Sequence, residues 1–231
     1  MPVAHKEDKR EITIVLASTR AGTLLPPQLL YAGKTDQVHP TFRFTDGWDV
    51  FHTDRHWATT ESTKRFAEVF LLPYVKQIRE KLDIPELPAI ILHDVHASHR
   101  DEALLKLFHG NNCHVRFVPA NLTSELQPND QLINRSFKSK LMHEYEDFYT
   151  SEFIRQFELH DDVTRISIDT RLVAIRNKHA SWVVSAFNDI AQKAQMIHTA
   201  WTKAGLRDPD PDEPQDNYEL NTHLFESDTD D

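Results

Sequence analysis

Two short apolar runs separated by a helical pattern constrain the fold of this chain most strongly. Residues 88–93 form the first run, and residues 114–118 form the second, which Pro119 ends. Between them, residues 101–108 have helical spacing and stop at Gly110. Short, nearly continuous apolar runs are typical of buried parallel strands. The sequence therefore predicts a strand, helix, strand unit of the α/β type.

The segment before this unit predicts a different strand arrangement. Residues 11–19 and 29–32 are apolar, and Gly22 and Gly33 follow them. They predict two strands of a meander, joined by a short connection. Residues 34–58 have little periodicity, which predicts a loop or a broken hairpin.

Three segments have the apolar spacing of helices. Residues 59–82 begin with threonines that can cap a helix, and Pro73 predicts a bend or a division. A long helix is expected from Asp130 to about residue 149, and a final helix over 180–203, which Gly205 ends. Strands covered by helices define an α/β fold.

Charge divides the chain unevenly. The net charge is −10, and residues 208–231 carry ten acidic side chains without any Lys or Arg. We therefore predict a disordered acidic tail there, and the neutral remainder leaves a nucleic-acid partner open. The predicted domains are a charged lead over 1–10, a core over 11–150 and a helical extension over 151–207, which begins where periodicity fades.

Compartment and membrane signals are few. The single cysteine, Cys113, excludes an intramolecular disulfide, and no signal peptide pattern precedes the first charged run. No apolar stretch approaches the roughly 20 residues that cross a bilayer. We expect an intracellular protein that does not insert into membranes.

Two aspartates are the candidate catalytic and metal-binding residues. Asp94 ends the apolar run at 90–92, and Asp130 follows the polar sequence 127–129. An aspartate at a strand end lies on the rim of a sheet, and two such carboxylates can hold a divalent cation. Alternatively, Asp94 starts a turn and Asp130 caps the helix that follows it.

Basic and imidazole side chains surround these acids. His93, His96 and His99 suggest a zinc hydrolase as a remote alternative, although an extended segment would place His93 and His96 on opposite faces. His99 is the best candidate to orient a ligand or a substrate. Lys138, on the predicted helix after Asp130, is a candidate phosphate contact, unless it only forms a solvated face.

Short segments taken in order form a recognisable pattern. They are residues 12–18, 21–22, 25–34, 57–60, 72–74, 92–99, 115–119, 126–131, 137–138 and 201–205. As a set they resemble the DDE superfamily endonuclease domain of pogo- and jerky-type transposases across 11–149, with 201–205 as its closing helix.

This resemblance implies a ribonuclease H-like mixed sheet flanked by helices. It also implies three acids that bind two Mg²⁺ or Mn²⁺ ions during displacement at a DNA phosphodiester. Asp94 would be the second acid and Asp130 the third, and Val95 replaces the family's Asn. The implied partner is DNA, the location is the nucleus, and the intact parent protein is a possible homo-oligomer.

The first acid of the family pattern has no counterpart among these residues. In the family it lies on a strand before the one expected at 11–19, and Asp8 lies in a charged run instead. We therefore expect a chain truncated at its start, without the first central strand and without an upstream helix-turn-helix region. The strands at 11–19 and 88–93 would then expose unpaired edges and leave the domain marginally stable. The resemblance thus leaves open an inactive endonuclease domain or a non-catalytic DNA- or protein-binding module.

Overall fold

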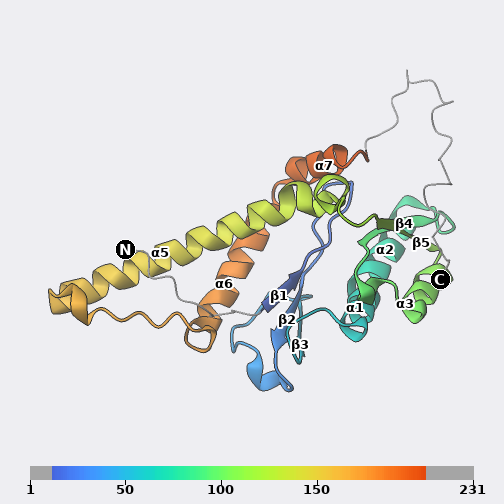
Figure 1. Cartoon of the computed structure of the whole chain (residues 1–231). Coiled ribbons are helices and arrows are strands. Elements are labelled where there is room, and N and C mark those ends of the chain that lie inside the picture. The colour runs from blue at the N-terminus through green and yellow to red at the C-terminus, as the bar shows by residue number, and fades with distance from the viewer. Residues whose placement is uncertain (1–11, 207–231) are drawn as a thin grey trace.

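A computed structural model describes residues 12–206 and combines helices with two small sheets (Figure 1). The first sheet has the order β1-β2-β3, with β1 (Ile12–Val15) antiparallel to β2 (Gln28–Ala32). This confirms the predicted meander. The predicted lead over 1–10 and the predicted tail over 208–231 lie outside the described residues.

The third strand corrects the loop or broken hairpin predicted for residues 34–58. Within that segment, β3 (Asp49–Thr53) pairs in parallel with β2. Its five residues are too few to produce a clear alternation, and its buried ends are the polar residues Asp49 and Thr53. The strand forms because β2 supplies a complete ladder of backbone partners.

The second sheet confirms the predicted strand, helix, strand unit. Strand β4 (Ala89–Asp94) is parallel to β5 (Cys113–Val118), and α3 (Glu102–Gly110) connects them. The side chain of Asp101 accepts a hydrogen bond of 3.0 Å from the Leu104 backbone N–H and so caps α3.

The helix before β4 is irregular where the sequence predicts a division. It comprises α1 (Thr60–Phe66), the π-helical turn η2 (Ala67–Leu71) and α2 (Leu72–Leu82). The turn widens immediately before Pro73, because proline has no N–H to donate into the helical ladder. Thr59 starts α1 with a capping box.

The second half of the chain is helical. Its elements are α4 (Thr123–Leu126), the π-helical turn η4 (Asn129–Ile133), α5 (Asn134–His160), the short turn η5 (Val163–Arg165), α6 (Leu172–Ala191) and α7 (Ala194–Lys203). Two further short turns, η1 (Asp36–Val38) and η3 (Ala97–His99), lie between strands and helices.

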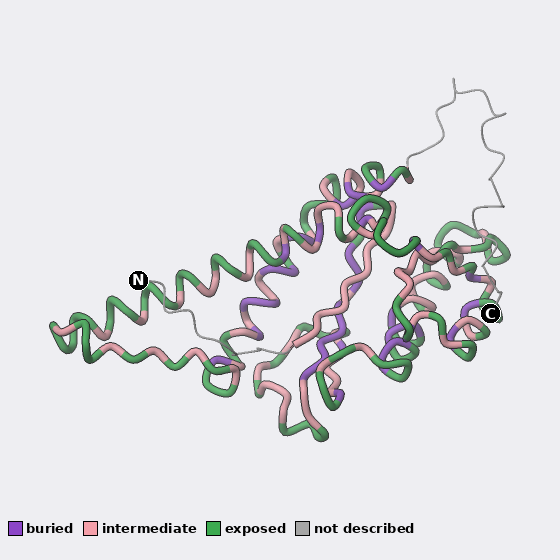
Figure 2. Tube along the Cα trace, in the orientation of Figure 1, coloured by how far each residue is buried: buried purple, intermediate pink, exposed green. Residues whose placement is uncertain are grey.

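Helix α5 continues beyond the end that the sequence predicts. Its second half has no buried apolar stripe: the stacked pair Phe153 and Phe157 stays exposed, and Glu152 with Arg155 is a surface ion pair. Figure 2 shows that this half is largely exposed or intermediate. Periodicity of apolar residues therefore failed to reveal it.

The final helix predicted over 180–203 is two helices. Helix α6 starts earlier, and a break at Gln192 and Lys193 lets α7 pack against η4. The predicted stop is confirmed: Gly205 has φ +82°, and its N–H donates to the Thr202 carbonyl.

Two clusters of buried side chains form the core. The larger lies where α5, α6 and α7 meet the first sheet, and the smaller lies between η2, α3 and the second sheet (Figure 1). The helix and sheet layers agree with a ribonuclease H-like α/β fold. Among residues 12–206, no helix has both the length and the apolar character needed to span a membrane.

Candidate metal and nucleic-acid site

A cavity of about 1160 Å³ lies between the two sheets. Residues of β1 line it on one side, and all six residues of β4 line it on the other. Within the described part of the chain, β1 is paired only with β2, and β4 only with β5. The two strands expected to have unpaired edges therefore border one cavity.

Asp94 is the last residue of β4 and lines this cavity. Its Oδ1 accepts a hydrogen bond of 2.5 Å from His99 Nδ1 and one of 3.2 Å from the His96 backbone N–H. The hydrogen bond from His99 is the main cause that lowers the pKa of Asp94. The side chain is 37% exposed, so the structure presents an ionised and accessible carboxylate.

His93 fixes the position of His99 from the core side. The two imidazole rings stack with their centroids 4.2 Å apart, and the His93 ring also lies 5.9 Å from that of Phe108. Burial lowers the pKa of His93 to about 4, so this imidazole is neutral at physiological pH. Because the His93 ring is neutral, the Asp94 carboxylate interacts with His99 and remains available to a bound cation.

The zinc alternative at His93, His96 and His99 is not supported by this geometry. His96 Nδ1 lies 2.8 Å from Ser98 Oγ, and His99 Nδ1 is engaged by Asp94. Among the described residues, metal-ligand atoms of three or more side chains converge in one group, and it contains none of these histidines.

Asp130 lies inside η4, which corrects its prediction as a helix cap. The helical backbone already begins at Pro128, whose φ of −54° suits a first turn. The exposed Asp130 carboxylate instead accepts a hydrogen bond of 2.7 Å from Asn134 Nδ2. Asn129 and Asn134 line the cavity, whereas Asp130 is not among its lining residues.

Lys138 is exposed on the first part of α5. The candidate residues therefore divide into two sets. Asp94 and His99 meet at the cavity, and Asp130 and Lys138 lie on the exposed side of η4 and α5.

A polar network that the sequence analysis missed ties three distant segments together. Asn129 Nδ2 donates to the Leu16 carbonyl at 2.8 Å, and Ser18 Oγ donates to Asn129 Oδ1 at 2.6 Å. Trp201 Nε1 donates to Ser18 Oγ at 3.1 Å. Ser18, Asn129 and Trp201 each lie in a segment that carries the family resemblance. That common feature is the only indication in the sequence that these three residues meet.

The two small sheets and their helices define an α/β domain, with the acid Asp94 at the end of β4. The family model described as DDE superfamily endonuclease matches residues 9–201. The chain therefore belongs to the DDE superfamily endonuclease family. No curated protein and no solved structure matches it.

Nucleases of this family use divalent metal ions, and the donor set here can be compared with that requirement. Asp94 fits one ligand position, because it is ionised, accessible and hydrogen-bonded through Oδ1. Asp130 offers a second carboxylate from outside the cavity lining. The described residues do not bring three acidic ligands together at Asp94, so they do not by themselves form the three-acid site that the resemblance implies.

Proposed function

We propose that this chain is a DNA-processing domain of a pogo- or jerky-type transposase, in which Asp94 is a metal-binding carboxylate. The carrying observation is the placement of Asp94 at the carboxyl end of a parallel strand, where active sites of α/β sheets lie. Its ionisation and its opening onto the cavity between the sheets support the same role.

Each neighbouring residue has a distinct part in this proposal. His99 orients the Asp94 carboxylate, Asp130 supplies a second carboxylate, and Lys138 contacts a DNA phosphate. Mg²⁺ or Mn²⁺ is the expected ion, since hard cations prefer carboxylate oxygens. Such an ion, when bound, would polarise a phosphodiester and activate a nucleophile.

A DNA substrate implies a nuclear location for the protein. A homo-oligomeric assembly of the intact parent protein also belongs to this proposal.

A non-catalytic binding module is the second candidate function. It is favoured because Asp130 does not line the cavity and because three acidic ligands do not converge at Asp94 among the described residues. In that case the domain binds DNA or a protein without cutting a phosphodiester.

The effect of Mn²⁺ on binding of a DNA duplex by the full chain would distinguish a metal-binding Asp94 from a module that binds without a metal, and a cleavage assay would detect any remaining enzyme activity. We expect salt-sensitive DNA binding that weakens in Lys138→Ala, and no cleavage in Mg²⁺. Addition of Mn²⁺ should raise the DNA affinity of the wild type but not that of Asp94→Asn. Asp83→Asn is the matched control, because Asp83 is exposed and lies outside the cavity lining. Its φ of +57° is one that Asn also tolerates.

Cleavage that is lost in Asp94→Asn and kept in Asp83→Asn would establish the enzyme and reject the binding module. A Mn²⁺ effect on DNA affinity that persists in Asp94→Asn would contradict the role proposed for this carboxylate.

A further inference from the structure

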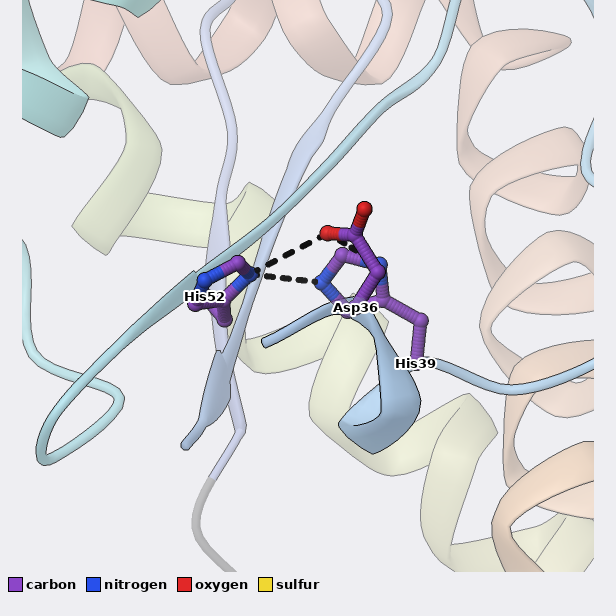
Figure 3. Close-up of side chains that lie close together, drawn as sticks. All are labelled: Asp36, His39 and His52. Carbon is purple, nitrogen blue, oxygen red and sulfur yellow. Dashed lines mark hydrogen bonds and ion pairs between the residues drawn. The ribbon is translucent and has the colours of Figure 1, made fainter. Parts of the chain in front are cut away.

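A second group of metal-ligand side chains lies on the first sheet, away from the cavity at Asp94. Figure 3 shows Asp36 and His39, from the turn η1 and its C-terminal cap, facing His52 of β3. Within residues 12–206, this is the group of three or more such side chains whose ligand atoms all lie within 4.8 Å of one another. None of the three lines the cavity that contains Asp94.

The two separations from His52 Nδ1 to its partners match those between ligand atoms of a tetrahedral ion. His52 Nδ1 lies 3.3 Å from His39 Nε2 and 3.4 Å from Asp36 Oδ1. Zinc holds nitrogen and oxygen ligands at about 2.0–2.2 Å, which places two tetrahedral ligand atoms about 3.3–3.5 Å apart. Without an ion, His52 Nδ1 has at most one proton to share between two acceptors.

The burial of both imidazoles suits a metal site. The side chains of His39 and His52 are 16% and 23% exposed, and burial is the main cause that lowers the pKa of His39. Neutral imidazole is the form that ligates a metal. Arg176, whose charge opposes a cation here, donates Nη1 to the Gln37 carbonyl and is the smallest influence on the pKa of His39.

The backbone around the group is tightly constrained. At Gly33, with φ +154°, an added Cβ would lie 2.3 Å from Val38 Cγ1, so η1 folds closely over the end of β2. His39 is further held by a backbone hydrogen bond at Phe51 and by the Tyr31 ring, whose centroid is 5.8 Å away. Contacts of this kind orient metal-binding histidines.

We propose that Asp36, His39 and His52 bind one Zn²⁺ ion and that the ion clamps η1 to β3. The Asp36 side chain is 88% exposed, so the fourth coordination position faces solvent. Two imidazoles favour zinc over the hard cations expected at Asp94, so the two sites select different metals.

Zinc titration of the full chain, after metal removal with a chelator, tests this assignment. With a chromophoric chelator as competitor, we expect one Zn²⁺ per chain and no displacement by excess Mg²⁺. His39→Ala, His52→Ala and Asp36→Asn should each weaken binding at least about tenfold, since even outer contacts of a metal site cost that much. Asp36→Asn changes an exposed side chain, so its effect on binding is separable from folding, which circular dichroism would verify.

Two control variants separate this site from other histidines. His99→Ala removes the partner of Asp94, and His114→Ala removes an exposed imidazole on β5; both should bind Zn²⁺ as wild type does. Failure of the folded wild type to bind Zn²⁺ would overturn the assignment. Equal affinity in His52→Ala and Asp36→Asn, or loss of binding in His99→Ala, would do the same.

Discussion

The ion pair between the buried Asp49 and the half-exposed Arg65 offers the sharpest test of how the first sheet is held to its neighbouring helix. Asp49 begins β3 with its side chain 5% exposed, and Arg65 reaches it from α1. Arg65 Nε lies 3.0 and 2.9 Å from the two carboxylate oxygens, and Nη2 lies 2.7 Å from Oδ1. Gln28 Nε2 donates to Asp49 Oδ2 at 2.8 Å.

Replacing Arg65 and replacing Asp49 should lower the free energy of unfolding by different amounts. Removing one partner of a buried pair costs about 3–5 kcal/mol, because the other charge stays buried. Arg65→Met leaves Asp49 with Gln28 alone, but the Arg65 side chain is 46% exposed, so solvent screening places the loss near about 3 kcal/mol. Asp49→Asn leaves a cation that water can reach, so we expect a smaller loss of about 1–2 kcal/mol.

Urea unfolding monitored by circular dichroism would measure both free energies. Arg155→Met is the matched control, because Arg155 forms an equally bidentate pair with Glu152 on the surface of α5 and should leave stability unchanged. If Arg65→Met and Arg155→Met were equally stable, or if Asp49→Asn cost more than Arg65→Met, the reasoning would be refuted.

Two further predictions concern a buried histidine and a close backbone approach. Burial lowers the pKa of His93 from 6.5 to about 4, so the unfolded chain binds a proton there more readily than the folded chain. The free energy of unfolding is therefore fully retained above pH 6.5 and falls by about 3 kcal/mol as the pH drops toward 4. His93→Phe should flatten the free energy of unfolding across that window, and the control His114→Phe, at an exposed position, should not. Gly22 and Gly47 both have positive φ, +87° and +91°, so alanine at either position costs about 1–2 kcal/mol of backbone strain. At Gly22 the added Cβ would also lie 2.8 Å from the Ala194 carbonyl oxygen, whereas at Gly47 it meets nothing within 4 Å. Thermal unfolding should therefore show a larger loss of stability for Gly22→Ala than for Gly47→Ala. Equal melting temperatures in the two glycine variants, or an unchanged pH profile in His93→Phe, would contradict these accounts.

Local sequence patterns were sufficient for the part of the fold that positions Asp94. One face of β4 and β5, with Ala89, Ile91, Cys113 and Val115, packs against α3 and η2, so the composition of these runs indicated strands. The burial predicted for the first run is only partial, because Ile90 on the other face of β4 is 68% exposed. The Schellman-type stop at Gly205 followed from glycine's freedom at positive φ. In these regions, local propensity and tertiary packing agree.

Long-range pairing explains what the sequence could not indicate. Strand β3 depends on β2 for its hydrogen bonds, and the pairing of Tyr31 with His52 determines where His52 lies relative to His39. No spacing rule connects residues 36, 39 and 52 across a segment whose sequence predicts a loop or a broken hairpin. Likewise, the position of Asp130 relative to Asp94 depends on where the helical backbone begins at Pro128.

The binding of Mn²⁺ at Asp94 in the presence of a DNA duplex tests the central proposal most directly. The measurement would use electron paramagnetic resonance on the full chain in an Asp36→Asn background, so that the second site is not counted. We predict bound Mn²⁺ in this background and in the variant that adds Asp83→Asn, and loss of that signal when Asp94→Asn is added. The same bound signal with and without Asp94→Asn would contradict the account.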